Sequence, residues 1–255
     1  MLYCLKENLE MNDVAIRKTY MLRFVGRIFV LLCCIAYCFI RPEHLKVMEG
    51  MGFFKEITLL HLLWVVWMID MAMQLFPFKV KTSIGSQKNF KKWYKKADYW
   101  IPENLEEFTK VLNKRALAVF IVWVIFIALI GLVYHKGFIG NAVILVFATA
   151  FYVCDLICVL FWCPFRLFLG NKCCTTCRIF NWDHFMMFTP FVFIPGFFTW
   201  SLLGVAVLVM VIWEVTVHIH PERFWEGSND TLKCKCCKDK LCTQYCGKAP
   251  KRNVG

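Results

Sequence analysis

The chain has 255 residues, of which 59% are hydrophobic and 25 are phenylalanine, and its formal net charge is +12. This composition excludes one water-soluble domain, because the apolar residues form long runs that each match a bilayer in length. The basic residues cluster between these runs, where they set orientation and meet anionic lipid headgroups, so nucleic acid is not expected as a partner. The composition predicts an all-α, multi-pass membrane protein.

Five apolar stretches define the expected helical bundle, at residues 20–40, 57–76, 116–134, 141–163 and 185–217. The last stretch would form a helix of about 50 Å, whereas the hydrocarbon core is about 30 Å thick. Pro190 and the Pro195-Gly196 pair interrupt it. We therefore expect either one long bent helix or a hairpin of two short ones. Residues 1–220 would then form a transmembrane domain of five or six segments.

The polar loop at residues 77–115 predicts the orientation of the bundle. It contains ten Lys or Arg against four Asp or Glu, and the KNFKKWYKKADYW sequence interleaves lysines with aromatic residues. This pattern is typical of a cytoplasmic loop at the headgroup level. Counting spans from it places the N-terminus and residues 164–184 in the cytoplasm, and we expect a bacterial-type inner membrane. The side on which the basic tail, residues 221–255, lies depends on the span count.

Fifteen cysteines are present, and two groups of them lie outside the apolar spans. The loop group contains a CxxC pair at Cys174 and Cys177, and the tail contains another at Cys234 and Cys237. Two thiolates at this spacing can bind one soft metal ion, and two such pairs complete a Cys₄ site. The candidate ligands are Cys163, Cys173, Cys174, Cys177, Cys234, Cys237 and Cys242.

Several chemistries could use these thiols. A zinc ion would be structural and would attach the tail to the loop. An iron–sulfur cluster would carry electrons, and a dithiol pair could act as a redox relay. Inert or palmitoylated cysteines are the remaining alternative.

The segment CDLICVLFWCPF, residues 154–165, resembles the CxxxCP segments of membrane-bound ferredoxin-type electron-transfer proteins. In that family a span ends in a Cys-Pro ligand, and further cysteines follow in a cytoplasmic loop. The resemblance around Cys158–Pro164 makes Cys158 and Cys163 the corresponding positions. It implies an iron–sulfur cofactor and electron transfer.

Polar residues at the edges of the last apolar stretch are further candidates. Asp183 could orient His184 as a metal ligand or proton carrier. The alternative is that Asn181 or Asp183 caps a helix. His218 and His220 could chelate a metal from an extended segment, or they could simply be solvated.

Acidic residues inside the spans are costly in lipid and should face one another, a basic partner or water. These are Asp70, Asp155 and Glu214. They could form a proton or ion path, or they could make structural hydrogen bonds within the bundle. Arg27, near the start of the first span, is expected to extend to the headgroups.

The leading hypothesis is a membrane protein with a cytoplasmic thiolate site for iron–sulfur or zinc, which transfers electrons together with other membrane subunits. Two alternatives stay open. One is a small transporter or channel that uses the intramembrane carboxylates and has a structural zinc site. The other is a structural subunit without activity of its own. No motif of a soluble enzyme is present, and whether the protein is an enzyme is left open.

Overall fold

The computed structural model describes residues 13–76, 89–99, 101–169 and 177–233. Within these ranges the chain forms helices and no strand. The α-helices are α2 (Asp13–Ile40), α3 (Leu59–Leu75), α4 (Pro102–His135), α5 (Asn141–Leu160), α6 (Phe165–Leu169), α7 (Asp183–Phe188) and α8 (Phe197–Ile219). The 3₁₀ helices are η1 (Pro42–Met48), η2 (Gly52–Phe54), η4 (Lys91–Trp93), η6 (Arg178–Trp182), η7 (Thr189–Phe193), η8 (Pro221–Arg223) and η9 (Asp230–Leu232).

Among the described residues, four helices are long and apolar enough to cross a membrane. They are Arg17–Ile40 within α2, and α4, α5 and α8. Helix α3 is also apolar but has 17 residues. These lengths are compatible with a membrane protein, and the all-helical architecture agrees with the expected fold class.

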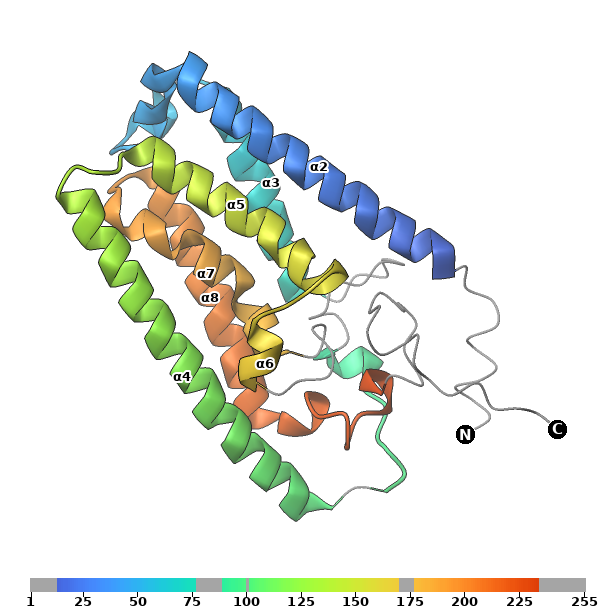
Figure 1. Cartoon of the computed structure of the whole chain (residues 1–255). Coiled ribbons are helices and arrows are strands. Elements are labelled where there is room, and N and C mark those ends of the chain that lie inside the picture. The colour runs from blue at the N-terminus through green and yellow to red at the C-terminus, as the bar shows by residue number, and fades with distance from the viewer. Residues whose placement is uncertain (1–12, 77–88, 100, 170–176, 234–255) are drawn as a thin grey trace.

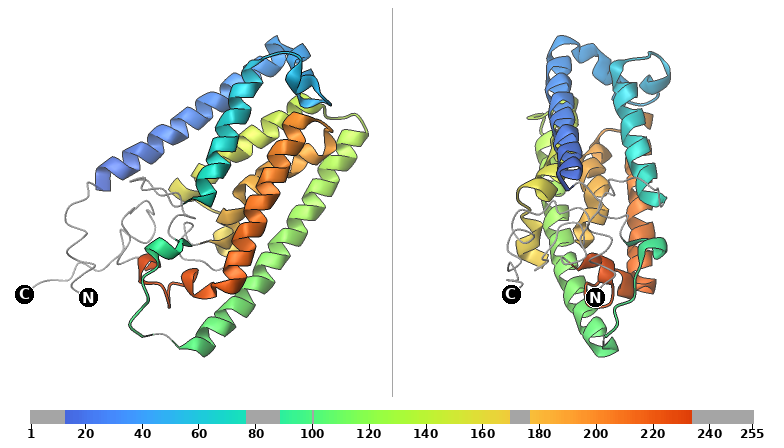
Figure 2. Two further views of the ribbon diagram at one scale, coloured as in Figure 1. Left: turned by 180° about the vertical axis from the view of Figure 1, so that it is seen from behind. Right: turned by 90° about the vertical axis from the view of Figure 1, so that its right-hand side faces the viewer.

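The long helices run side by side in a bundle, with α2 and α4 on opposite sides of it (Figure 1). Helix α2 packs mainly on α5, α3 packs on α8, and α7 lies between α5 and α8. The 3₁₀ segments η1 and η2 join α2 to α3 at one end of the bundle (Figure 2). Consequently α2 is held mainly by its contact with a single helix.

Local sequence explains where several helices begin. Thr58 and His61 form a capping box at the start of α3, in which the backbone N–H of Thr58 donates to His61 Nδ1 at 3.0 Å. His61 is therefore a capping residue of α3. Pro102 occupies the first turn of α4, where its missing N–H costs nothing. Helix α4 continues without a break to His135, so the last part of the polar 77–115 segment, from Pro102 on, and the third apolar stretch form one helix.

The apolar stretch at residues 185–217 reverses direction at Pro195 and Gly196. Before the reversal, η6, α7 and η7 pack against α8, and Arg178 of η6 reaches Glu214 near the far end of α8. The reversal is attached to the η1–η2 connection by two backbone hydrogen bonds. Gly50 N donates to Pro195 O at 2.7 Å, and Phe197 N donates to Gly50 O at 2.9 Å. The segment before α8 thus runs antiparallel to it.

Aromatic side chains fill the centre of the bundle. Trp67 of α3 is fully buried and meets Phe188 of α7 edge-on, with ring centroids 5.2 Å apart. Phe188 in turn stacks on Phe191 at 5.6 Å. Large aromatic surfaces contribute strongly to burial, so this cluster fixes α7 and η7 between α3 and α8.

The segment before α4 and the segment after α8 lie together at the other end of the bundle. Ala97 N donates to Ser228 O at 3.0 Å, and Asp230 N donates to Lys95 O at 2.8 Å. Thr231 Oγ1 donates to Trp93 O at 2.8 Å. The basic segment around η4 and the start of the tail therefore share one end.

We expect Gly196→Ala to lower the melting temperature of the detergent-solubilised protein. A Cβ at residue 196 would lie 1.9 Å from Met48 O, a backbone atom, and overpacking of this kind costs about 1–3 kcal/mol. The matched control is Gly204→Ala within α8, the helix that Gly196 precedes as its N-cap residue, because a Cβ there meets nothing within 4 Å and alanine favours the helix. Equal melting temperatures for the two variants would contradict the close approach at Gly196.

Candidate functional site

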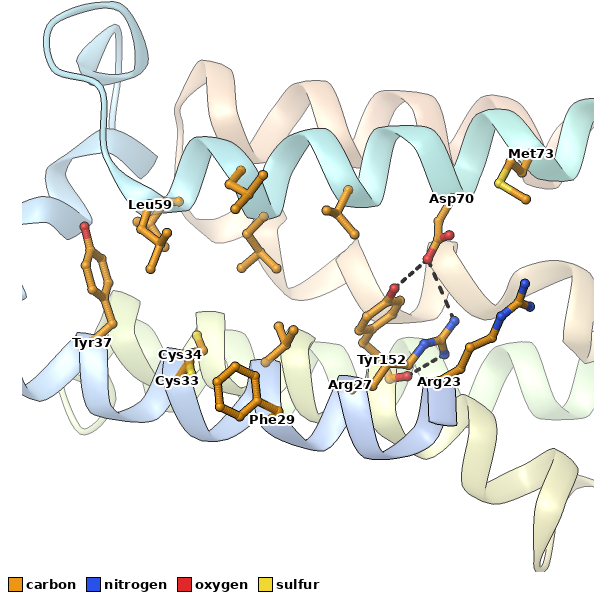
Figure 3. Close-up of a pocket in the computed structure, with 16 residues that line it drawn as sticks. Arg23, Arg27, Phe29, Cys33, Cys34, Tyr37, Leu59, Asp70, Met73 and Tyr152 are labelled. Carbon is orange, nitrogen blue, oxygen red and sulfur yellow. Dashed lines mark hydrogen bonds and ion pairs between the residues drawn. The ribbon is translucent and has the colours of Figure 1, made fainter. Parts of the chain in front are cut away.

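Three charged side chains from three helices meet inside the bundle (Figure 3). Arg27 Nη1 of α2 donates to Asp155 Oδ2 of α5 at 2.8 Å, and Arg27 Nη2 lies 3.8 Å from Asp70 Oδ2 of α3. The three side chains are 13%, 14% and 22% exposed, in that order. One guanidinium thus serves two carboxylates that lie far apart in the sequence.

Tyr152 completes this arrangement from one turn earlier on α5. Its hydroxyl donates to Asp70 Oδ2 at 2.7 Å, and its backbone carbonyl accepts from Arg27 Nη1 at 2.7 Å. The Arg27 guanidinium also lies 3.8 Å from the centroid of the Tyr152 ring, which adds a cation–π attraction. Tyr152 therefore fixes both the cation and one of its anions.

The expectation that Arg27 extends to the headgroups is wrong. Helix α2 begins at Asp13, seven residues before the expected span. Arg27 consequently lies about 21 Å along the helix from its first residue. At this depth the guanidinium finds carboxylates on neighbouring helices instead of water at the helix end.

A second polar group lies against the first. Gln74 of α3 donates through Nε2 to both Asp183 carboxylate oxygens at 2.9 Å. The same amide nitrogen is 2.9 Å from His184 Nδ1, which is 2.9 Å from Asp183 Oδ1. Asp155 interacts electrostatically with both Asp183 and His184, and His184 also interacts with Asp70. The two groups therefore act on each other through their charges.

We call these seven side chains the charge cluster: Arg27, Asp70, Gln74, Tyr152, Asp155, Asp183 and His184. They come from α2, α3, α5 and α7. The cluster contains three carboxylates, one guanidinium and one imidazole. With all carboxylates ionised its formal charge is −1 if His184 is protonated and −2 if His184 is neutral. In addition, Gln74 Oε1 is buried without a hydrogen-bond partner among the described residues. With its carboxylates ionised, the charge cluster therefore carries a net negative charge, and one of its hydrogen-bond acceptors has no donor among the described residues.

Asp183 does not cap a helix from the N-cap position, and neither does Asn181. Trp182 is the N-cap residue of α7 and makes no side-chain capping bond. Asp183 instead accepts from Gln74 and also from the backbone N–H of His184 at 2.6 Å. The expected capping role is therefore wrong, because a partner on α3 competes for this carboxylate.

The remaining candidates from the sequence lie elsewhere. Glu214 is not part of the charge cluster, since it pairs with Arg178 and accepts from Trp182 Nε1 at 2.8 Å. His218 is exposed, and His220 Nδ1 lies 3.2 Å from Glu222 Oε1. Glu214 therefore links η6 to α8 and is separate from the other acids.

The thiols are only partly described. Cys163 and Cys177 are buried, and the thiols of Cys158 and Cys163 are in hydrogen-bonding contact. Cys173, Cys174, Cys234, Cys237 and Cys242 lie outside the described residues. Among the residues that are described, no group of three or more His, Cys, Asp or Glu side chains is placed to hold one metal ion.

Sequence reasoning missed three members of the charge cluster. Gln74 follows Asp70 by four residues, and Tyr152 precedes Asp155 by three, so each pair lies on one helical face. A polar side chain three or four residues from an intramembrane acid could have indicated that Gln74 and Tyr152 belong to the same polar site. For Arg27 the signal was its place within an apolar run.

Comparison with known proteins found no match: no protein-family model, no curated protein and no solved structure resembles this chain significantly.

We expect Arg27→Gln to destabilise the protein strongly. Removing one partner of a buried ion pair leaves an uncompensated charge and costs about 3–5 kcal/mol. Arg41→Gln is the control, because Arg41 pairs at 3.5 Å with Glu43 while both side chains are more than half exposed, and exposed pairs contribute about 0–1 kcal/mol. The free energy of unfolding, measured by denaturing-detergent titration in mixed micelles, should fall for Arg27→Gln alone. Similar losses for the two variants would contradict a buried pair.

Proposed function

We propose that this chain is a multi-pass membrane protein that takes up and releases protons at its charge cluster, as the coupling step of a transporter. The observation that carries this proposal is the convergence of Asp70, Asp155 and Asp183 on Arg27 and His184 inside an apolar bundle. Ionisable groups in such surroundings are costly, and they mark proton and ion paths in membrane proteins.

Charge balance supports protons as the species that moves. The charge cluster carries a formal −1 or −2 when its carboxylates are ionised, and burial disfavours an unbalanced charge. Adding one or two protons makes the sum zero. The same acids then lose protons when the cluster faces a compartment of higher pH.

The position of Arg27 suggests how a proton would change the structure. Arg27 donates to Asp155 at 2.8 Å and lies 3.8 Å from Asp70. A proton on Asp155 weakens the first contact, because a neutral carboxyl attracts the guanidinium less than a carboxylate does. Arg27 then moves toward Asp70, which transfers the charge contact of α2 from α5 to α3.

The distribution of lysines and arginines supports an orientation. The segments around η4 and Asn229, which are hydrogen-bonded to each other, lie at the end of the bundle that carries the basic 77–115 loop. By the positive-inside rule this end faces the cytoplasm. The tail would then begin in the cytoplasm, and the antiparallel segment before α8 would serve as a sixth crossing.

The test is a pH jump on proteoliposomes adsorbed to a solid-supported membrane, which records charge displacement even without a transported solute. The wild type should give a transient current, and Asp155→Asn, which keeps the side-chain shape but cannot ionise, should reduce the current about tenfold or more. Glu43→Gln removes an exposed carboxylate and should leave the current unchanged. A wild type at the background of empty liposomes, or an undiminished current in Asp155→Asn, would reject the proposal.

A thiolate metal site is a second candidate, favoured by the contact between Cys158 and Cys163 and by the burial of Cys163 and Cys177. It would hold zinc or an iron–sulfur cluster and would support the tail or electron transfer with other membrane subunits. Cys163 and Cys177 would be two of the metal ligands. The other candidate ligands, Cys173, Cys174, Cys234, Cys237 and Cys242, lie outside the described residues.

For this candidate we expect Cys163→Ser/Cys177→Ser to lose bound metal, since serine is a poor ligand for soft metal ions. Iron, zinc and acid-labile sulfide are measured on protein purified without oxygen. Cys154→Ser is the control, because Cys154 is exposed and stands outside both cysteine groups. Metal retained by the double variant, or absent from the wild type, would remove this candidate.

A further inference from the structure

The most buried part of the charge cluster consists of Gln74, Asp183 and His184, which we call the inner group. Gln74 and His184 are 2% and 7% exposed. A cavity of about 550 Å³ lies between α2 and α3, and Asp70 and Tyr152 of the charge cluster line it (Figure 3). The three side chains of the inner group are not part of its wall. How a proton is held in the inner group therefore depends on the contacts of these side chains with one another.

The Gln74 amide nitrogen lies at the same distance from three acceptor atoms. Gln74 Nε2 is 2.9 Å from each carboxylate oxygen of Asp183 and 2.9 Å from His184 Nδ1. The carboxylate fixes the orientation of this amide, because only the NH₂ group can donate to it. A primary amide has two N–H groups. Gln74 can therefore donate to Asp183 and to His184 Nδ1 at the same time, without moving.

His184 Nδ1 lies between a donor and an acceptor. It is 2.9 Å from Gln74 Nε2 and 2.9 Å from Asp183 Oδ1. A ring nitrogen donates a hydrogen bond when it carries a proton and accepts one when it does not. A protonated Nδ1 therefore donates to Asp183, whereas a bare Nδ1 accepts from Gln74. The partner of Nδ1 changes with the position of the proton.

Asp183 does not need the imidazole proton to satisfy its carboxylate. Its Oδ1 atom accepts from the backbone N–H of His184 at 2.6 Å, and Gln74 donates to both of its oxygens. By contrast, Gln74 is the hydrogen-bond donor that the described residues offer to a bare Nδ1. The donor that decides whether Nδ1 can lose its proton is therefore Gln74.

Burial and the surrounding charges act on His184 in opposite directions. Burial disfavours a charge on the imidazole, whereas three carboxylates favour one. The three are Asp183 of α7 itself, Asp70 of α3 and Asp155 of α5. Segments α8 and η6 also pack near α7, where Glu214 pairs with Arg178 and His218 is exposed. Because the opposing effects offset each other, one hydrogen bond to Nδ1 can decide which state the ring adopts.

We propose that Gln74 is a positioning residue that makes the contact between His184 and Asp183 a proton relay. In one state, Nδ1–H of the imidazolium donates to the Asp183 carboxylate. In the other state, the N–H bond is broken, an O–H bond has formed at Asp183 Oδ1, and the bare Nδ1 accepts from Gln74. The net charge stays the same, and both groups become neutral, which burial favours. This inference rests on the proton function proposed above and names the atoms between which the proton passes.

The test is the ¹⁵N NMR spectrum of the ring nitrogens of His184 in the full-length chain in detergent micelles. All six histidines are labelled, and the signals of His184 are those that His184→Gln removes. The pH is raised until one ring nitrogen has lost its proton, and the couplings to the two ring C–H protons distinguish Nδ1 from Nε2. In the wild type the bare nitrogen should be Nδ1. A bare Nε2 would overturn the relay, because Nδ1 would then keep its proton beside Asp183.

Two variants remove the donor at residue 74. Gln74→Met keeps an unbranched side chain of similar length without an N–H group, and Gln74→Glu offers a carboxyl group in place of the amide. In both variants the neutral ring should keep its proton on Nδ1 and lose the proton on Nε2, so that the tautomer reverses. A correctly folded variant with the wild-type tautomer would overturn the role of Gln74. Either variant is sufficient, so one that fails to fold leaves the other for the test.

The matched control is Ser201→Ala. It removes a hydrogen bond of the same length between α3 and α8, in which Trp64 Nε1 donates to Ser201 Oγ at 2.9 Å. Ser201 has no contact with the inner group among its hydrogen bonds. The His184 tautomer should therefore stay as in the wild type. A reversal in Ser201→Ala would overturn the inference, because any loosening of α3 would then have the same effect.

His61 is a reference within each spectrum. Its Nδ1 accepts from the backbone N–H of Thr58 at 3.0 Å, and its Nε2 lies 2.8 Å from the carbonyl oxygen of Phe53. A bare Nδ1 is therefore expected for His61 in the wild type and in every variant.

The pH-jump current separates this inference from the proposed function. A reversed tautomer and a smaller current in Gln74→Met support both. An unchanged tautomer in Gln74→Met, together with a wild-type current, overturns the relay and leaves the proton function intact. A wild type without a current rejects the proton function, whichever tautomer His184 adopts.

Discussion

The ion pair between Arg27 and Asp155 is the interaction on which the arrangement of this bundle depends. A guanidinium and a carboxylate that are both about one-eighth exposed lose most of their hydration, and their attraction repays this cost only with good geometry and further hydrogen bonds. Tyr152 supplies a further hydrogen bond through its backbone carbonyl, and its ring holds the guanidinium in place by a cation–π contact. Arginine suits this position because its planar fork can donate to Asp155 and the carbonyl while its face lies on the ring. A lysine offers no such planar face.

Apolar packing and backbone contacts hold the rest of the charge cluster in place. Trp67 lies one turn before Asp70 on α3 and is clamped by Phe188, which belongs to the same short helix as His184. The aromatic cluster therefore sets the distance between α3 and α7, and with it the contact of Gln74 with Asp183. At the far end, Gly50 and Gly196 approach closely and attach the reversal to the η1–η2 connection. The charge cluster is thus positioned by the aromatic contacts between α3 and α7 and by the backbone contact between Gly50 and Gly196.

The sequence predicted the helical class and named all three cluster acids as candidates, because apolar runs and polar residues within or beside them are local signals. It did not predict which acids meet. Asp70 and Asp155 converge while Glu214 pairs with Arg178, and this difference depends on the order in which helices pack, which no local pattern encodes. The depth of Arg27 was misjudged because α2 begins seven residues before its apolar run. The cysteine pattern is equally local, but most of those residues lie outside the described segments, so the thiolate site stays a prediction.

The weak packing of α2 makes its position sensitive to the charge contact of Arg27. Of its most apolar 18-residue window only 11% is buried within the protein, against 50% for α5. Dispersion contacts with the bundle are therefore few, and the charge contact of Arg27 is a large part of what fixes α2 relative to α5 and α3. If a proton on Asp155 moves this contact toward Asp70, α2 approaches α3 and the cavity between them narrows.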